Sequence, residues 1–248
     1  MTSNSATPAA IVTGATRGIG RGIAGMLARR GCNLTIAARD EGALGVIADE
    51  FEQLGISTNI VAGDVGKEGH AAALVEGHMA AFGRLDAVIF AAGIGTSSLI
   101  AGYPEGRLSR QIDVNFRAPF LVSALAIPHM RATSKHWNRV ARFVAIASLE
   151  GLYPEPGLAA YAATKSALLS LTAAINAEER LNGVMATAIS PGYVDTDMSD
   201  WISDQIPKAS MLEVDDVVRC VEMILDLSPQ ALVPHLELHR RTADPYKA

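Results

Sequence analysis

The chain has 248 residues, 49% of them hydrophobic, and its 21 basic side chains against 26 acidic ones give a net charge of −5. This length suits the core of one α/β domain, and the acidic balance does not indicate binding to nucleic acid or to an anionic membrane surface. The two cysteines, Cys32 and Cys220, predict no disulfide framework and favour a reducing cytoplasm.

The N-terminal region combines a tail with a strand, a glycine-rich turn and a helix. Segment 1–10 lacks the basic start and the apolar run of a signal peptide, so we expect a short loose tail there. The run AAIVT (9–13) predicts a buried strand, and GATRGIG (14–20) leads into a helical pattern. Glycines in this setting let the backbone approach a pyrophosphate, and the helix N-terminus favours the anion. The turn is therefore predicted to bind a dinucleotide.

Short apolar runs alternate with helical patterns along the rest of the chain. Between the second and third runs, Leu44, Ile47, Phe51 and Leu54 recur at helical spacing, and Gly55 supplies a stop. Such alternation predicts a parallel sheet built of βαβ units with helices on both faces. We expect one Rossmann-type, doubly wound α/β domain over 1–248, with seven strands at about 9–13, 33–38, 57–62, 86–90, 140–147, 184–190 and 231–238.

The end of the second predicted strand bears on which dinucleotide binds. A unit selective for NAD usually has an acidic residue there that bonds the ribose 2′-OH, whereas an arginine accommodates the 2′-phosphate of NADP. This chain has Ala38 and Arg39 followed by Asp40, and Arg17 lies within the glycine turn. Guanidinium groups suit phosphate oxygens, so we expect NADP(H) as the cofactor. The alternative is that Arg39 is a surface charge and Asp40 caps the next helix.

Tyr161 and Lys165 lie four residues apart in a stretch (158–171) that is rich in Ala and Leu and contains no Gly or Pro. Such a stretch predicts a helix, and these two positions share one face of it. The lysine charge would favour the ionised phenol and so lower its pKa. Tyr161 is therefore a candidate to give or take a proton in a carbonyl/alcohol interconversion.

Segment 195–212 follows the sixth predicted strand and carries Trp201 with several aliphatic residues. One interpretation is a mobile lid that excludes water from a bound substrate. The other is a surface helical hairpin that packs its own apolar side chains. The sequence leaves both open.

The last predicted strand has His235, Glu237 and His239 on one face, because side chains alternate along a strand. Such a trio could bind zinc, but a closed set of four ligands is missing. We therefore expect no metal site, and an exposed face with Leu236 and Leu238 turned to the core.

Several short motifs follow one another in a fixed order. They are TGATRGIG (13–20), Asp64 in GDV, AAG (91–93), Asn115 in DVN, Ser148 in IAS, Tyr161 with Lys165, and PGYVDT (191–196). Ser148 lies thirteen residues before Tyr161. In this order and spacing, nearly the whole chain resembles the single-domain branch of the short-chain dehydrogenase/reductase family.

The resemblance implies a catalytic set of Asn115, Ser148, Tyr161 and Lys165. Ser148 would donate a hydrogen bond to the substrate carbonyl oxygen, and Tyr161 would transfer the proton. Lys165 would lower the pKa of Tyr161 and bond the nicotinamide ribose. Asn115 would hold a water that links Lys165 to solvent.

The resemblance also implies contacts with the cofactor. Asp64 would contact the adenine, and the Thr196 hydroxyl would hold the nicotinamide carboxamide. The expected cofactor-binding residues are Gly14, Thr16, Arg17, Gly18, Ile19, Gly20, Arg39, Asp64, Val65, Ala91, Gly93, Tyr161, Lys165, Pro191, Gly192, Val194 and Thr196.

The chain departs from the family pattern in three places. Segment 132–143 is longer than the usual link before the fifth strand and lacks its glycine, so the resemblance does not predict this loop. Phe90 and Ala91 replace the more usual asparagines, which should alter how that turn is braced. The C-terminus lacks the usual glycine-rich ending, so the resemblance does not predict how the last strand packs across subunits.

These motifs predict an NADP-dependent oxidoreductase that transfers a hydride between NADP(H) and a small-molecule carbonyl or secondary alcohol, with a ketone reductase as the leading hypothesis. A 3-oxoacyl thioester reductase is the alternative within the class. A non-catalytic, NADP-sensing protein on the same fold is the alternative outside it, and the intact Ser148–Tyr161–Lys165 set favours the enzyme. A group of basic residues could dock an acidic carrier protein or form a solvated loop: Arg131, Lys135, Arg139 and Arg142.

The substrate pocket is expected between the segments that follow Ser148 and Gly192. Its candidate linings are Glu150, Tyr153, Tyr193 and Trp201. Glu150 stands where the family usually has a small or apolar residue, and burying its carboxylate is costly without a partner. It therefore either recognises a cationic or hydroxyl-bearing part of the substrate or points to solvent.

The helices around 119–130 and 158–181 carry more apolar surface than one sheet face can cover. In proteins of the family these two helices pair across subunits. We therefore expect a homodimer or a homotetramer.

Overall fold

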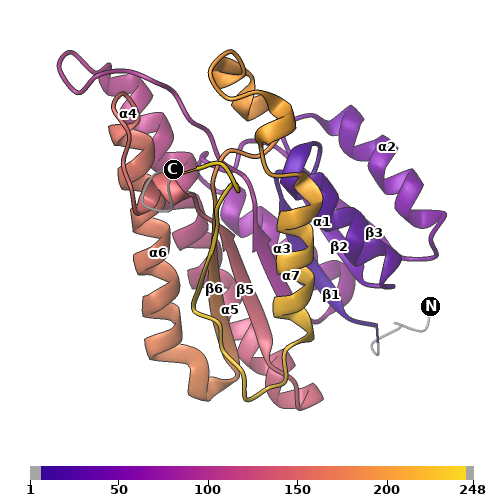
Figure 1. Ribbon diagram of the computed structural model, residues 1–248. Helices are drawn as coiled ribbons and strands as arrows, with labels where there is room; N and C mark the ends of the chain where they lie inside the picture. Colours follow the sequence, from indigo (N-terminus) through magenta and orange to yellow (C-terminus); the bar gives the residue numbers. More distant parts are fainter. Residues whose placement is uncertain (1–6, 244–248) are drawn as a thin grey trace.

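The computed structural model of the protein describes residues 7–243, so the predicted loose tail lies mostly outside the described residues. Within them, seven strands form one sheet in the order β3-β2-β1-β4-β5-β6-β7, and every neighbouring pair is parallel (Figure 1). The strands are β1 (Ala9–Thr13), β2 (Asn33–Ala38), β3 (Thr58–Ala62), β4 (Ala87–Phe90), β5 (Ala141–Ile146), β6 (Val184–Pro191) and β7 (His235–Leu238).

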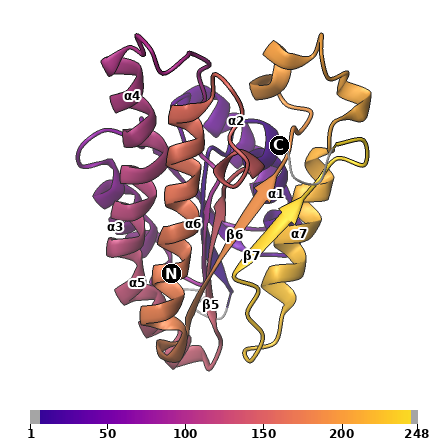
Figure 2. The same ribbon diagram turned by 60° about the vertical axis from the view of Figure 1, so that its left-hand side comes forward.

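Helices cover both faces of the sheet, as predicted. On one face lie α1 (Gly18–Arg29), α2 (Glu41–Glu52) and α7 (Val214–Asp226). On the other lie α3 (His70–Phe82), α5 (Ala118–Trp137) and α6 (Ala159–Glu179), and Figure 2 shows α3, α5 and α6 across the sheet from α7. The helix α4 (Glu105–Ile112) runs into α5 through a π-helical turn, η1 (Asp113–Arg117). Within residues 7–243, no helix is long and apolar enough to cross a membrane.

The two-sided cover explains why the strands are continuously apolar. Ile89 of β4 packs into the core that contains Ile23 of α1, whereas its neighbours Val88 and Phe90 pack into the core that contains Leu74 of α3. Every residue of β4 is therefore buried, and a parallel strand with helices on both sides needs this pattern.

The strands begin and end within one residue of the predicted positions, except at the start of β7. The strand predicted from 231 begins at His235. Pro234 has no N–H to donate, and the preceding carbonyl groups bond side chains instead of a neighbouring strand: Ala231 accepts from Arg142 at 3.1 Å and Val233 accepts from Thr187 at 2.7 Å.

Helix ends also differ from the predicted pattern in two places. Helix α2 ends at Glu52, so Leu54 lies beyond it and is 51% exposed instead of packing on the helix face. In the long link before β5, Asn138 adopts a left-handed conformation with φ of 50° directly after α5. Asparagine tolerates this conformation, so Asn138 can end the helix without a glycine.

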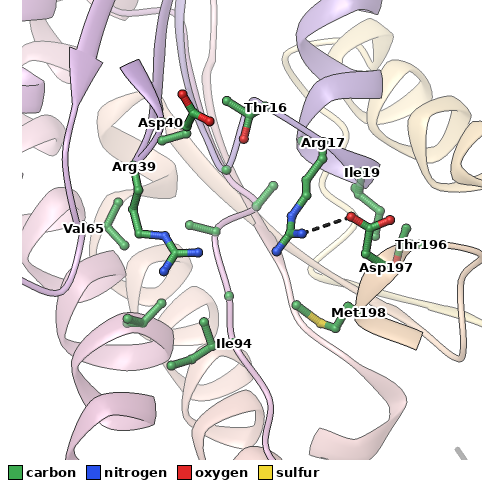
Figure 3. A pocket seen from close by; sticks show the side chains of 18 of the residues that line it. Thr16, Arg17, Ile19, Arg39, Asp40, Val65, Ile94, Thr196, Asp197 and Met198 are labelled. Atoms are coloured by element: carbon green, nitrogen blue, oxygen red, sulfur yellow. Dashed lines mark hydrogen bonds and ion pairs between the residues drawn. The ribbon is translucent and has the colours of Figure 1, made fainter. Parts of the chain in front are cut away.

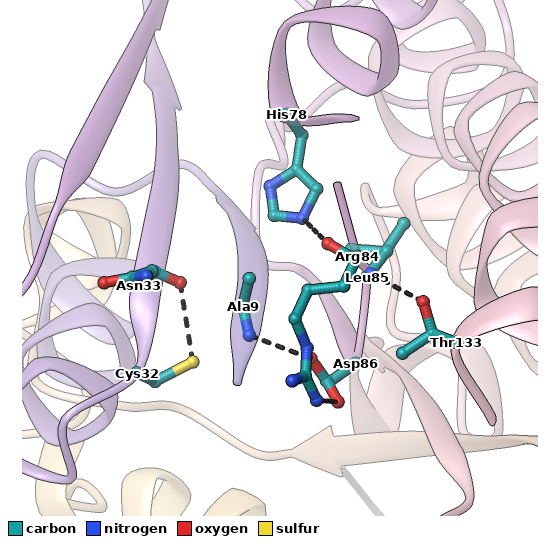
Figure 4. Close-up of polar contacts among 8 residues, drawn as sticks. All are labelled: Ala9, Cys32, Asn33, His78, Arg84, Leu85, Asp86 and Thr133. Atoms are coloured by element: carbon teal, nitrogen blue, oxygen red, sulfur yellow. Dashed lines mark hydrogen bonds and ion pairs between the residues drawn. The ribbon is translucent and has the colours of Figure 1, made fainter. Parts of the chain in front are cut away.

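A polar network ties together the amino ends of β1 and β4 (Figure 4). The Asp86 carboxylate accepts from the backbone N of Ala9 at 2.9 Å and pairs with the Arg84 guanidinium at 2.6 Å. That guanidinium also stacks on Trp137, 4.3 Å from the ring centroid. His78 contacts the Arg84 carbonyl at 2.8 Å, and burial lowers the pKa of His78 to about 4, so the imidazole is neutral. The network fixes the relative position of the two strands whose opposite ends form the site.

Strands β1 and β4 are neighbours in the sheet. The strand order continues from β1 to β2 and β3 on one side and from β4 to β5, β6 and β7 on the other, so a crevice opens at the carboxyl ends of β1 and β4. Thr13, the last residue of β1, accepts hydrogen bonds from the backbone N of Ala91 at 3.2 Å and of Ala92 at 3.1 Å. Phe90 points into the core and is 1% exposed. Thr13 therefore braces the turn that lacks the family's asparagines.

Candidate active site

A cavity of about 830 Å³ opens over the glycine turn at the carboxyl ends of the central strands. We call it the glycine-turn cavity. It is lined by most of the residues predicted to bind the cofactor: Gly14, Thr16, Arg17, Gly18, Ile19, Gly20, Arg39, Asp64, Val65, Ala91, Gly93 and Thr196.

Close backbone packing explains the glycines at 14 and 20. A Cβ atom on Gly20 would lie 2.3 Å from the Gly14 carbonyl oxygen, and one on Gly14 would lie 3.0 Å from the backbone of Ala92. Gly14 also has a φ of +69°, which other residues rarely adopt. Arg17 is the N-cap residue of helix α1, and its side chain makes no capping hydrogen bond to the first N–H groups of the helix. This compact turn and open helix end fit a pyrophosphate.

Arg17 and Arg39 extend into the glycine-turn cavity from two sides (Figure 3). Arg39 is exposed and forms no ion pair with any residue in 7–243. Arg17 pairs with Asp197 at 3.0 Å, but both side chains are mostly exposed, so the pair is weak. Asp40 accepts from the backbone N of Ala43 at 3.0 Å and caps α2, as one sequence interpretation held. The glycine-turn cavity therefore offers two cations, and Asp40, the acid that follows Arg39 in the sequence, is engaged with the N-terminus of α2.

Arg110 is a residue of this cavity that the sequence analysis missed. Its guanidinium pairs with the Asp64 carboxylate at 2.6 Å, and Asp64 also accepts from the backbone N of Gly66 at 2.9 Å. Burial alone would raise the pKa of Asp64, but these hydrogen bonds hold it below its usual range. Arg110 thus keeps Asp64 ionised and oriented. Asp197 and Met198 also line the cavity and were not predicted.

A second cavity of about 520 Å³ adjoins the first, and we call it the Tyr161 cavity. The two share a wall made of Ile19, Ala91, Gly93, Thr196 and Met198. The Tyr161 cavity is also lined by the predicted residues Ser148, Tyr161, Lys165, Pro191, Gly192 and Val194. A group bound in the first cavity would therefore face the predicted catalytic side chains across this shared wall.

Ser148 reaches the Tyr161 cavity because the turn after β5 packs tightly on α6. Ser148 follows β5 and caps the short 3₁₀ turn η2 (Leu149–Gly151), its Oγ accepting from the backbone N of Glu150 at 3.2 Å. A Cβ atom on Gly151 would lie 2.9 Å from the carbonyl carbon of Lys165. Glycine at 151 thus lets the turn approach the helix that carries Tyr161.

Tyr161 and Lys165 share one face of α6, with the Lys165 Nζ 5.6 Å from the Tyr161 ring centroid. Nζ donates to the Ile146 carbonyl at 2.7 Å, and burial lowers the pKa of Lys165 to about 8. The predicted lowering of the Tyr161 pKa by Lys165 is wrong for this structure. Burial raises the pKa of Tyr161 to about 12, while a hydrogen bond with Ser148 opposes that shift and the charge of Glu150 adds to it.

Asn115 lies in the π-helical turn η1 and is fully buried. Its side chain bonds both backbone groups of Ile94, accepting from N at 2.9 Å and donating to O at 2.8 Å. It also donates to Thr164 Oγ1 at 3.0 Å, and Thr164 in turn donates to the Tyr161 carbonyl at 2.8 Å. Asn115 therefore ties the turn after β4 to the helix of Tyr161, close to both cavities but lining neither.

The predicted substrate residues do not all lie together. Glu150, Tyr193 and Trp201 line the Tyr161 cavity. Tyr153 does not line it and lies next to His239, with 6.4 Å between the two ring centroids, because the chain has already turned away from Ser148 at that point. Further lining residues that the sequence did not single out are Gly95, Thr96, Ser97, Arg107 and Leu158.

Segment 195–212 projects above the carboxyl edge of the sheet, in orange in Figure 1. Its base is closed by a hydrogen bond from the Asp195 backbone N to the Leu212 carbonyl at 2.9 Å. It contains two short 3₁₀ helices, η4 (Asp197–Ile202) and η5 (Lys208–Ser210), and no α-helix. Ile202 is buried, and Trp201, 54% exposed, lines the Tyr161 cavity. The segment thus packs some of its own apolar side chains and also borders both cavities.

The histidines of β7 are engaged in other contacts. His235 contacts the Ser190 hydroxyl at 2.9 Å, and His239 contacts Glu237 at 3.0 Å. Leu236 and Leu238 pack against the core, as predicted. Across residues 7–243, no group of three His, Cys, Asp or Glu side chains could hold a metal ion.

Sequence comparisons agree with the geometry. The family profile described as short chain dehydrogenase matches residues 8–207. A protein of Chlamydia muridarum named 3-oxoacyl-(acyl-carrier-protein) reductase FabG is 34% identical over 200 residues, which is 80% of this chain and 78% of that protein. The protein of the same name from Staphylococcus aureus is 30% identical over 210 residues, 84% of this chain and 83% of that protein.

Solved structures give the same result at the level of the fold. An alcohol dehydrogenase from the archaeon Thermococcus sibiricus, complexed with 5-hydroxy-NADP, superposes with a TM-score of 0.86 at 25% identity and covers 96% of this chain and 99% of its own. A 3-ketoacyl-(acyl-carrier-protein) reductase from Brucella melitensis, complexed with NADH, has a TM-score of 0.84 at 26% identity and covers 93% of this chain and 96% of its own.

Proposed function

Because the chain belongs to the short-chain dehydrogenase family of oxidoreductases, we propose that it reduces a ketone to a secondary alcohol with NADPH. One observation carries the proposal: Ser148, Tyr161 and Lys165 line a cavity that shares a wall with the glycine-turn cavity. A nicotinamide cofactor bound across that wall supplies the hydride. The protein's task is then to position the carbonyl and to supply a proton.

The protonation state of Tyr161 supports the direction of reduction. A phenol whose pKa is raised to about 12 is protonated at neutral pH, which is the form that can donate a proton to the developing alkoxide. In this proposal Ser148 donates a hydrogen bond to the same oxygen. Lys165 has an ammonium group that still predominates at neutral pH with a pKa of about 8, and it would bond the nicotinamide ribose hydroxyls.

The contacts of Asn115 indicate a second role beside the predicted binding of a water. Both N–H groups of its side-chain amide donate, to the Ile94 carbonyl and to Thr164, and Oδ1 accepts from Ile94 N, so the side chain positions the turn after β4 and only Oδ1 keeps a lone pair that could hold the predicted water.

The preference for NADPH over NADH is supported by the two guanidinium groups in the glycine-turn cavity. Arg39 has no competing ion pair within residues 7–243, and Arg17 has only an exposed one. Asp40 caps α2 and so does not compete for the ribose 2′-OH position. Both arginines are therefore free to contact a 2′-phosphate.

A 3-oxoacyl thioester reductase is the second candidate, favoured by the names of the two bacterial relatives. The basic group considered for carrier-protein docking gives it less support. Arg142 is buried and bonds the carbonyl groups at the end of α7, and Arg131 pairs with Glu179. Only Lys135 and Arg139 of that group remain exposed without a recorded ion pair within 7–243.

A substrate screen tests the proposal and separates the two candidates. The purified protein is assayed by NADPH absorbance with small linear ketones, cyclic ketones and 3-oxoacyl thioesters carried on a short pantetheine arm. We expect kcat/KM to be higher for one of the ketone classes than for the thioesters. Higher values for the thioesters would favour the second candidate, and no oxidation of NADPH with any carbonyl would refute both.

Segment 195–212 is proposed to act as a lid over the nicotinamide end of the cofactor. Its closed base, its 3₁₀ turns and its lining of both cavities support this role.

The cytoplasmic location and the single-domain organisation over 1–248 remain predictions from the sequence. The free cysteines Cys32 and Cys220 are consistent with a cytoplasmic location.

The sequence predicted self-association through the helices around 119–130 and 158–181, and we propose that the surface includes the first of these, α5, and extends onto α4. Phe120, Leu121 and Leu125 of α5 are each more than 40% exposed, and Leu108 and Ile112 continue the apolar stripe onto α4. Exposed apolar residues in one row favour burial in a subunit contact. Sedimentation velocity at micromolar concentration should give a dimer or a tetramer, and Leu121→Asp should shift it towards the monomer. A wild-type protein that sediments as a 26.1 kDa monomer would contradict this proposal.

A further inference from the structure

Glu150 is a buried acid in the wall of the Tyr161 cavity. Its side chain is only 4% exposed, and neighbouring wall positions are apolar, including Ala147, Leu158 and Val194. Burying a carboxyl group in such surroundings is costly unless its oxygens find donors. The contacts of the two oxygens therefore indicate what this group does.

The two oxygens of Glu150 differ in their partners. Oε2 accepts from the backbone N of Glu155 at 2.9 Å, which braces the turn after Ser148. Oε1 is buried and has no hydrogen-bond partner among residues 7–243. A turn of the carboxyl group about its broad terminal torsion would bring Oε1 to the cavity that Glu150 lines, and a donor on a bound ligand would offset the weakening of the Oε2 bond. One acceptor site is thus left open next to the proposed reaction centre.

The groups around Glu150 leave it without a cationic partner. Tyr161 and Tyr193 face it as neutral phenols, and the Tyr193 hydroxyl donates to Glu155 Oε2 at 3.0 Å. Lys165 lies in the same cavity but donates to the Ile146 carbonyl. Burial, with the charge of Glu155 adding, raises the pKa of Glu150 to about 7.

Two arginines lie farther out. Arg240 has its guanidinium 5.7 Å from the Tyr193 ring centroid, and exposed Arg107 lines the Tyr161 cavity. Neither forms a recorded ion pair with Glu150 among the residues of 7–243. No residue in 7–243 thus supplies a donor to Oε1, and a ligand in the Tyr161 cavity can supply one.

We propose that Glu150 is a specificity-determining residue whose Oε1 accepts a hydrogen bond from a hydroxyl or ammonium group on the ketone substrate. This inference rests on the proposed function, since it assigns a substrate class to the same cavity. Glu150 follows Ser148 by two residues, and its backbone N donates to the Ser148 Oγ at 3.2 Å. Both residues line the Tyr161 cavity, so a ketone held by Ser148 can present a donor to Glu150.

The test compares ketones that differ only in a donor. The first pair is hydroxyacetone and methoxyacetone. The second pair is cyclohexanone with a hydroxyl group and cyclohexanone with a methoxy group opposite the carbonyl. The cyclohexanone with an amino group at the same position serves as the cationic substrate. The readout is the ratio of kcat/KM for the hydroxyl member to that for the methoxy member. The wild-type protein should favour the hydroxyl or the amino member.

Glu150→Gln should lower this ratio at least tenfold, equivalent to about 1.4 kcal/mol. A glutamine keeps one oxygen for the Glu155 N–H and so places its NH₂ group where Oε1 was. The open acceptor becomes a donor, which suits the methoxy oxygen and not the hydroxyl hydrogen. Glu155→Gln is the matched control, because the Glu155 Oε2 already accepts from Tyr193. Since the charge of Glu155 helps to raise the pKa of Glu150, the control is compared at about pH 9, where the Glu150 carboxyl is ionised in both proteins, and there it should leave the ratio unchanged.

A pH series on the wild-type protein gives a second readout that needs no variant. The carboxyl group ionises as the pH rises through its value of about 7, and the ionised form is the stronger acceptor. The preference for the hydroxyl member should therefore rise between about pH 6 and about pH 8. In Glu150→Gln the ratio should not change with pH.

The outcomes separate this inference from the proposed function. If the wild-type protein reduces the ketones but its hydroxyl-to-methoxy ratio stays near one for both pairs and at every pH, the role of Glu150 is refuted and the proposed function stands. If no ketone is reduced with NADPH, the proposed function itself fails. Should Glu150→Gln not fold, the pH series on the wild-type protein decides alone.

Discussion

Tyr161→Phe is expected to lower turnover of the ketone by ~100-fold or more, the usual contribution of a positioned general acid. The substitution removes the phenolic hydroxyl and keeps the ring. The ring packs beside Gly95, where an added Cβ atom would lie 3.3 Å from Tyr161 Cδ2, so this packing should survive. Lys165 keeps its bond to the Ile146 carbonyl, so the cofactor side of the site should also survive.

The measurement is kcat at saturating NADPH and ketone, together with the Kd for NADPH from the change in its fluorescence on binding. We expect kcat to collapse while Kd and the thermal midpoint stay close to the wild-type values. A Tyr161→Phe protein that keeps more than about a tenth of wild-type turnover would contradict the general-acid role, since that loss is far below ~100-fold.

The wild-type protein is expected to bind NADPH at least tenfold more tightly than NADH, a difference worth about 1.4 kcal/mol. Arg39 has no ion pair to give up within residues 7–243, so its charge is available to the 2′-phosphate. Arg39→Asp should erase or reverse the preference, because a carboxylate repels the phosphate and can bond the ribose 2′-OH.

Titration of both cofactors into wild-type protein and variant measures this effect. Arg139→Asp is a matched control, since it makes the same charge change at an exposed position that lines neither cavity. The control should keep the wild-type preference. Equal affinities of the wild-type protein for NADPH and NADH would overturn the cofactor assignment.

Most of the fold could be predicted because its signals are local. Buried parallel strands such as β4 are continuously apolar, and glycines such as Gly55 mark helix ends within a few residues. The start of β7 could be predicted only in part in this way. Pro234 is a local sign that the strand starts late. The carbonyl groups of Ala231 and Val233, however, bond Arg142 and Thr187, which lie far away in the sequence, and the local pattern does not show these contacts.

The candidate site likewise has residues that local motifs predicted and residues that only long-range contacts reveal. The glycine turn and the Tyr161–Lys165 pair are contiguous motifs, and the structure brings them to two adjoining cavities. Arg110 was missed because it acts on Asp64 across a distance in the chain that no motif spans. The pKa of Tyr161 is raised and not lowered as predicted, because burial, which the sequence does not show, outweighs the hydrogen bond with Ser148.

Transfer of a labelled hydride tests the central claim most directly. The wild-type protein is incubated with a ketone that it accepts and with NADPH carrying deuterium at both C4 positions of the nicotinamide, and the product alcohol is analysed by mass spectrometry. Our account predicts that each alcohol molecule carries one deuterium on the former carbonyl carbon. Oxidation of NADPH without formation of the deuterated alcohol would contradict it.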